Sequence, residues 1–147
     1  MEKYIGTKLI EAERCPASKN HGAHKAGEPG YRVRYSDGYE SWSPKDAFEA
    51  AYLPVITNPE LRTTAPSVSQ QMVDDFIRET EVITMGDKTT VVRAILRNGF
   101  EIVESSACVS AENYDEKLGA ELCLEQIKNK VWILLGFLLQ TAVHGIK

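Results

Sequence analysis

Two arginines, an asparagine and a phenylalanine within eight residues are the side chains of this sequence best suited to bind a ligand. Arg93 and Arg97 alternate along one run, Asn98 follows directly, and Phe100 comes after a glycine. Arginine makes forked hydrogen bonds to phosphate oxygens, and a flat aromatic ring can stack on a nucleobase. These residues therefore predict a cradle for a nucleotide-like ligand.

Asn113 and Tyr114 are expected to add polar contacts to this cradle. They lie at the start of a long predicted helix, where unpaired backbone N–H groups favour an anion. A purely structural interpretation of the same residues stays open, in which Arg93 pairs with Glu104 across two strands and Phe100 belongs to the core.

Nothing in the sequence assembles a catalytic site. There is no G-x-S-x-G elbow and no G-x-x-x-x-G-K phosphate loop, and Cys108 and Cys123 fall in apolar surroundings. We predict no catalytic residues and no cofactor, and a binding protein rather than an enzyme. A nucleotide-cleaving enzyme is the weaker alternative.

Cys15, His21 and His24 form the only cluster that resembles a set of metal ligands. Their spacing matches no zinc motif, so no metal site is predicted. The three cysteines are odd in number and show no C-x-x-C spacing, which indicates free thiols in a reducing cytoplasm.

The composition is that of a globular protein, with 43% apolar and 26% charged residues. The formal charge of −4 argues against general nucleic-acid binding, which needs a basic surface. The N-terminus is charged from the start and does not resemble a signal peptide, so we expect a cytoplasmic protein.

The elements that must position the cradle are two Val- and Ile-rich runs in residues 89–109, which meet at Asn98-Gly99. This dipeptide predicts a β-hairpin with a two-residue type I′ turn. The resulting register pairs Arg97 with Phe100 and Arg93 with Glu104 on one face. The same face carries the pairs Ile95–Ile102 and Val91–Ser106. The other face carries Leu96, Ala94, Val92, Val103 and Ala107.

The first part of the chain predicts a small module over residues 1–57. It consists of a strand over 3–12, a long loop over 13–30, a hairpin that turns at Asp37-Gly38, and a short helix that Ser43 caps. Residues 58–69 contain two prolines and are predicted to be a linker.

Residues 70–147 are predicted to form a brief helix, a third strand over 80–85, the central hairpin and a long helix that Ser110 caps. The apolar residues of that helix recur at three- and four-residue spacing: Leu118, Leu122, Ile127, Val131, Leu134, Leu135 and Leu138. The fold class is therefore α+β: a strand–hairpin–helix module, then an antiparallel hairpin or sheet with a long C-terminal helix.

Residues 131–139 of the long helix are apolar nearly all round. A membrane span needs about 20 such residues, roughly twice this number, so no membrane partner is expected. We expect instead a homo-oligomer through the C-terminal helix. Coverage of this helix within one chain is the alternative.

The pattern NGFEI…S-A-C-V…NYDE-x-x-G, within residues 89–141, resembles the family of small phage accessory proteins named after gene products forty-nine and sixty-six of two tailed phages. The block KYIGTKLIEAE with GYRVRYSDGYESWSPKDAFEAAY resembles a module at the front of several phage accessory proteins. In some of these the second half is a Thoeris anti-defence type-two domain. Residues 15–29 depart from that module.

A hairpin followed by a long oligomerising helix also resembles the Thoeris anti-defence type-one proteins. This resemblance implies a sponge that holds cyclic ADP-ribose isomers or cyclic oligonucleotides without cleaving them, in the cytoplasm of an infected host. The alternative is an adaptor or inhibitor that binds a host enzyme through aromatic anchors of the first module, namely Tyr31, Tyr35, Tyr39 and Trp42.

Overall fold

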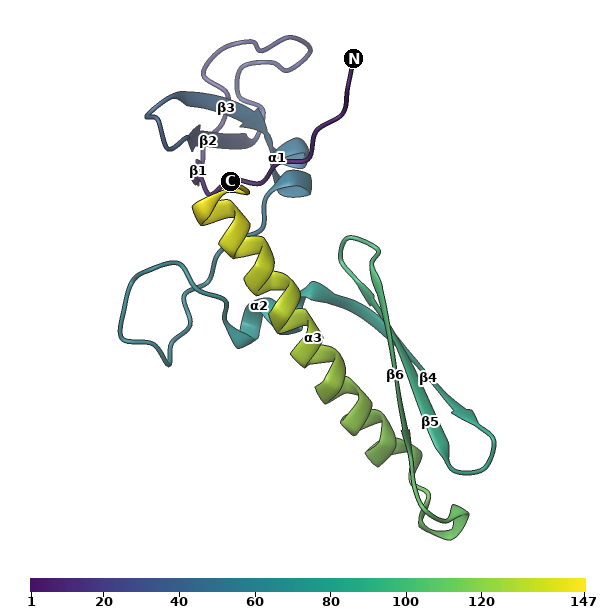
Figure 1. Ribbon diagram of the computed structural model, residues 1–147. Coiled ribbons are helices and arrows are strands. Elements are labelled where there is room, and N and C mark those ends of the chain that lie inside the picture. The colour runs from purple at the N-terminus through teal and green to yellow at the C-terminus, as the bar shows by residue number, and fades with distance from the viewer. The chain divides into compact units, whose positions relative to one another are not determined.

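A computed structural model describes all 147 residues, Met1–Lys147, and confirms the α+β class (Figure 1). The chain forms two compact units. One contains Met1–Pro54 together with Leu139–Lys147, and the other contains Val55–Leu138. In the first unit the backbone N–H of Leu9 donates to the carbonyl oxygen of Ala142 at 3.3 Å.

The first unit holds an antiparallel sheet in the order β1-β2-β3. Its strands are β1 (Glu11–Arg14), β2 (Gly30–Arg34) and β3 (Glu40–Pro44). The strand expected over residues 3–12 is wrong, because residues 1–10 form no strand. β1 pairs with β2 from Glu11, opposite Arg34, to Arg14, opposite Tyr31. Because β2 ends at Arg34, it offers no partner to the residues before Glu11.

The turn between β2 and β3 contains three residues. The N–H of Tyr35 donates to the Tyr39 carbonyl, and the N–H of Gly38 donates to the Tyr35 carbonyl, both at 2.9 Å. Gly38 has φ of 88°, a conformation that glycine adopts without strain. A type I turn followed by a left-handed glycine fits this arrangement.

The short helix α1 (Lys45–Ala51) follows β3 and packs through Phe48, whose ring stacks on Tyr31 with centroids 4.1 Å apart. Its cap is not Ser43 as expected. Pro44 occupies the N-cap position without a side-chain hydrogen bond, and the Ser43 hydroxyl donates to the Pro44 carbonyl at 3.4 Å.

The second unit begins with α2 (Gln70–Phe76), where the Ser69 side chain accepts a hydrogen bond from the N–H of Met72. The remaining elements are β4 (Ile77–Met85), β5 (Thr89–Leu96), β6 (Glu101–Ala107), the 3₁₀ helix η1 (Ala111–Asn113) and α3 (Glu116–His144), which belongs to this unit as far as Leu138. The sheet is antiparallel in the order β4-β5-β6, so the predicted third strand is confirmed and is longer than expected.

The core of the second unit lies between this sheet and α3, which runs along the sheet in Figure 1. Alternate residues of β5 are buried: Thr90, Val92, Ala94 and Leu96. They face a buried stripe of the helix made of Cys123, Ile127, Val131 and Leu135. Each buried Val, Leu or Ile contributes about 1.5–3 kcal/mol, so this layer is the main source of the unit's stability.

The segment predicted as a linker is hydrogen-bonded within the second unit. The N–H of Asn58 donates to Ser67 Oγ at 2.9 Å, and Ser69 Oγ accepts the N–H of Met72 at 3.3 Å. Among the helices, none has both the length and the apolar character that crossing a membrane requires.

Candidate functional site

The central hairpin turns through three residues, and the predicted two-residue type I′ turn is wrong. The N–H of Leu96 donates to the Phe100 carbonyl at 2.8 Å, and the N–H of Gly99 donates to the Leu96 carbonyl at 2.9 Å. Gly99 has φ of 85°, whereas no non-glycine residue has positive φ, as a type I′ turn would require of Asn98. Asn98 Oδ1 instead accepts a hydrogen bond from the N–H of Phe100 at 3.0 Å.

This turn shifts the register of the hairpin by one residue from the prediction. Arg93 pairs with Val103 rather than Glu104, and Ala94 pairs with Ile102. A shift of one residue exchanges the two faces of a strand. Ile102 therefore joins the buried face beneath α3, and Val103 moves to the open face, where it is 55% exposed.

Arg93 lies on the open face between two carboxylates. Its Nη2 lies 3.3 Å from Glu81 Oε2 on β4, and its Nη1 pairs with Glu101 on β6. These hydrogen bonds, that of Glu81 first, raise the pKa of the Arg93 guanidinium. The predicted pairing with Glu104 is wrong, and the positive charge of Arg93 is already compensated.

Arg97, Asn98 and Phe100 lie together at the tip of the hairpin. Phe100 is 55% exposed, and no carboxylate forms an ion pair with Arg97, whose N–H donates to the Phe76 carbonyl at 2.9 Å. The predicted pairing of Arg97 with Phe100 is wrong, because Phe100 pairs with Leu96. The tip combines a free guanidinium with an exposed aromatic ring.

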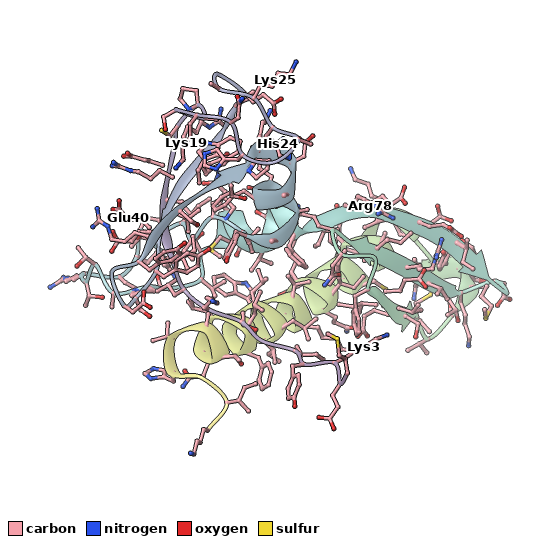
Figure 2. The ribbon with its side chains drawn as sticks, turned by 90° about the horizontal axis from the view of Figure 1, so that it is seen from above. Lys3, Lys19, His24, Lys25, Glu40 and Arg78 are labelled. Atoms are coloured by element: carbon pink, nitrogen blue, oxygen red, sulfur yellow. The ribbon has the colours of Figure 1, made fainter.

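A second arginine at this end of the sheet, Arg78, is not among the predicted site residues. Arg78 lies in a β-bulge of β4, next to Ile77, which pairs with Leu96 beside the hairpin tip. In Figure 2 its side chain points away from the sheet, and its only ion pair is a 3.6 Å contact with Glu79. Only the register of β4, which no local pattern predicted, brings Arg78 to this end.

Asn113 and Tyr114 do not join the tip. They follow the far end of β6, and the Tyr114 hydroxyl lies 3.0 Å from Thr90 Oγ1, at the start of β5. Thr90 and Leu96 are six residues apart on one strand, roughly 20 Å at 3.3 Å per residue. The predicted cradle is therefore divided between two ends of the sheet.

Tyr114 belongs to a hydrogen-bond chain that ties the start of α3 to the sheet. Each hydroxyl has one hydrogen to donate. Thr84 Oγ1 donates its hydrogen to the Glu116 carboxylate, so the Tyr114 hydroxyl, 2.7 Å from Thr84 Oγ1, must donate to Thr84. Thr90 must then donate to Tyr114. Thr90 is fully buried, which makes this partner necessary for its hydroxyl.

The remaining residues of the motif NYDE-x-x-G start the helix and bring it close to the sheet. Asp115 Oδ1 accepts the N–H of Leu118 at 3.1 Å, so Asp115, and not Ser110 as expected, caps α3. Gly119 lies against Thr90. The motif that carries the family resemblance thus has a structural role.

One carboxylate is enclosed between the sheet and α3. Glu104 has a side chain only 16% exposed and forms an ion pair with Lys130. Burial, followed by the charge of Glu104, raises the pKa of the Cys123 thiol. Cys123 is therefore a protonated core residue, unsuited to act as a nucleophile.

The long helix exposes apolar side chains away from the sheet. Within the second unit these are Leu118, Leu122, Ile133, Leu134, Phe137 and Leu138. The seven apolar residues of this helix that the sequence pattern picked out therefore divide into two sets. Ile127, Val131 and Leu135 are buried, and the exposed ones are Leu118, Leu122, Leu134 and Leu138. Self-association through the exposed set stays a prediction.

Most of the aromatic anchors proposed for an adaptor are engaged within the first unit. Tyr31 stacks on Phe48, Trp42 Nε1 donates to the Cys15 carbonyl at 2.8 Å, and Tyr35 stacks on Tyr39. Tyr39 alone of the four is largely exposed, at 65%.

The loop over residues 15–29 is organised around Trp42. His21 stacks on its ring at 4.9 Å, and His24 meets the ring edge-on at 6.0 Å while contacting Glu28 Oε2 at 2.8 Å. Lys19 and Lys25 lie on the same loop in Figure 2. No group of three His, Cys, Asp or Glu side chains is arranged to hold a metal ion.

Comparison with known proteins relates the second unit to a family. The sequence profile of the phage protein (N4 Gp49/phage Sf6 gene 66) family matches residues 68–143, just over half of the chain. The match includes all three strands of the second sheet and nearly all of α3. No curated protein and no solved structure matches the chain. The chain belongs to the phage protein (N4 Gp49/phage Sf6 gene 66) family.

Proposed function

We propose that this phage protein binds and sequesters a cyclic nucleotide signal of host defence, a cyclic ADP-ribose isomer or a cyclic oligonucleotide, without cleaving it. The observation that carries the proposal is the unpaired guanidinium of Arg97 beside the exposed ring of Phe100 at the hairpin tip. The layout of a hairpin and a long helix, which resembles the Thoeris anti-defence type-one proteins, supports the choice of ligand.

The chemistry of the tip suits a nucleotide. Arg97 can bind a phosphate in a forked arrangement, and Phe100 can stack a base, an interaction worth about 1–3 kcal/mol. Arg78 adds a second positive charge at the same end of the sheet. Asn113 and Tyr114 drop out of the ligand set that we propose for a single chain, because they lie at the other end of β5.

A second copy of the chain would complete the site. The tip residues are exposed, whereas a tightly held small ligand has most of its surface buried. The exposed leucines and isoleucine of α3 supply an apolar surface through which copies could associate. A site shared between copies would enclose the ligand from two sides.

The test is calorimetric titration of the full chain with cyclic ADP-ribose isomers, cyclic dinucleotides and cyclic trinucleotides. Replacing Arg97 with alanine removes a charge-assisted contact worth about 1.5–3 kcal/mol and should weaken binding about ten- to hundredfold. Arg62→Ala is the matched control, because Arg62 is exposed in the same unit and far along the chain from the tip. Equal affinities of the two variants, or no binding of any cyclic nucleotide, would refute the proposal.

The adaptor hypothesis makes the opposite prediction in a pull-down. An adaptor should retain a stoichiometric host enzyme and lose it on Tyr39→Ala, since Tyr39 is the largely exposed one of the four proposed anchors. A sponge should behave identically with and without this substitution.

A further inference from the structure

The first unit contains a cavity of about 290 Å³ that the proposed function does not use. It lies where β1 ends, where the long loop returns to β2, and where α1 begins. Its lining residues are Arg14, Cys15, Pro16, Gly27, Pro29, Gly30, Tyr31 and Lys45. All of them belong to Met1–Pro54, so the cavity is a feature of this unit alone.

The lining carries two positive charges, those of Arg14 and Lys45, and no carboxylate. Neither side chain forms an ion pair. The other arginines of this sheet do: Arg32 pairs with Glu13, and Arg34 pairs with Glu11 and Glu40. Arg32 and Arg34 line a second cavity together with those carboxylates. Of these two cavities, only the one lined by Arg14 and Lys45 has positive charges without carboxylates beside them in the lining.

Glu49, a carboxylate of α1, is hydrogen-bonded to a residue of the lining. The Tyr31 hydroxyl donates to Glu49 Oε1 at 2.8 Å, and this hydrogen bond raises the pKa of Tyr31. Glu49 is not part of the lining. The phenol also interacts with the Arg14 guanidinium, which opposes this rise in pKa, so Tyr31 contacts both Glu49 and Arg14.

We propose that this cavity binds the phosphate group of a small phosphomonoester. A phosphate monoester carries a charge of about −1.5 to −2 at neutral pH, which matches the two cations of the lining, whereas a carboxylate carries −1. Arg14 supplies a planar fork for two phosphate oxygens, and Lys45 supplies a compact charge.

The walls favour an ester over free phosphate. The volume is close to the lower end of the range for small-ligand sites, roughly 300–1,000 Å³, and exceeds what one phosphate group fills. Pro16 and Pro29 offer apolar surface, and Gly27, beside which nothing lies within 4 Å of a Cβ position, leaves room for a small organic group. This site is independent of the hairpin tip, which belongs to the other unit.

The experiment is calorimetric titration of the full chain with inorganic phosphate, glycerol 3-phosphate and free O-phosphoserine. We expect saturable binding of both esters, tighter than that of inorganic phosphate. Affinity should fall below about pH 6, where the ester loses its second charge. Acetate should not compete.

Four variants make the test specific. Arg14→Gln and Lys45→Gln should each weaken ester binding about ten- to hundredfold, with thermal unfolding recorded to confirm the fold. Arg32→Gln is the matched control, since its charge is already compensated by Glu13, and it should bind as the unchanged protein does. The Arg97→Ala variant should also bind the ester normally, which separates this site from the proposed nucleotide site.

Four results would overturn the proposal. The first is that neither ester binds at about 10 mM, which would mean an affinity weaker than millimolar. The second is that inorganic phosphate binds as tightly as the esters, and the third is that Arg32→Gln and Arg14→Gln lose equal affinity. The fourth is that a phosphoserine peptide binds more tightly than free O-phosphoserine. The last result would assign the cavity to a macromolecular partner instead.

Discussion

Gly119 of α3 lies so close to Thr90 of β5 that a Cβ at position 119 would stand 2.2 Å from Thr90 Oγ1. Thr90 is fully buried and its hydroxyl is bound to Tyr114, so it cannot move away freely. The glycine of the motif NYDE-x-x-G is therefore required by the distance between helix and sheet. Its role is packing, and the proposed ligand site lies at the other end of β5.

Replacing Gly119 with alanine should destabilise the protein. Overpacking of this kind costs about 1–3 kcal/mol, against a gain of about 1 kcal/mol in helix propensity, so we expect a net loss of up to roughly 2 kcal/mol in the free energy of unfolding. Urea denaturation measures it. Gly136→Ala is the control in the same helix, because a Cβ there meets nothing within 4 Å, and it should be neutral or stabilising. Equal effects of the two substitutions would contradict the packing account.

Tyr114→Phe should lower stability without altering ligand binding. The substitution keeps the ring but leaves the hydroxyls of Thr84 and Thr90 without their shared partner, and an unsatisfied buried hydroxyl costs about 1–3 kcal/mol. Denaturation and calorimetric titration of the same variant separate the two roles. A lost affinity with unchanged stability would show that Tyr114 contacts the ligand after all.

Acid should remove a small contribution of the pair between Asp74 and Lys128. The hydrogen bond from Lys128 Nζ, 2.9 Å long, lowers the pKa of Asp74 below its usual 3.8. A carboxylate with a lowered pKa stabilises the folded state above the unfolded-state value, and this contribution is lost as the pH falls through the folded-state value.

Both partners of this pair are partly exposed, so the effect should be roughly 0.2–1 kcal/mol. The free energy of unfolding should fall by this amount between about pH 7 and about pH 3 because of the pair, and Asp74→Asn should abolish this contribution to the fall. The neighbouring Asp75→Asn, whose carboxylate forms no ion pair, should retain it. Identical acid sensitivity in both variants would argue against the pair.

Self-association should depend on the exposed apolar residues of α3. We expect a sedimenting mass of at least two chains, reduced when Leu118 and Leu122 are both replaced by glutamine. Leu61→Gln is the control, since Leu61 is also exposed but lies outside the helix. A monomeric unchanged protein would remove the second copy from the proposed site.

The hairpin shows where sequence patterns lose precision. Asn98-Gly99 is compatible with a two-residue turn and with a three-residue turn that ends in a left-handed glycine. The choice depends on the opposite face of the sheet, because only the observed register places Ile102 beneath α3. Local residue types predicted both strands, but not which of their faces would be covered.

For a similar reason, the structure brings only some of the predicted site residues together. Tyr114 is close to Phe100 in the sequence, yet β6 carries the chain away from the tip, and Tyr114 binds Thr84 and Thr90 instead. Arg78 reaches the tip through the pairing of Ile77 with Leu96. Such long-range pairing is a property of the whole sheet and leaves no local signal.

The most direct test of sequestration is the chemical state of the ligand after binding. The full chain is saturated with the cyclic nucleotide that binds it best, separated from free ligand, and unfolded by heat, and the released compound is identified by mass spectrometry. We predict that the compound has the mass and chromatographic retention of the original cyclic nucleotide, in an amount that matches the bound chains. Release of a linear or otherwise altered nucleotide would contradict a sponge and would identify an enzyme.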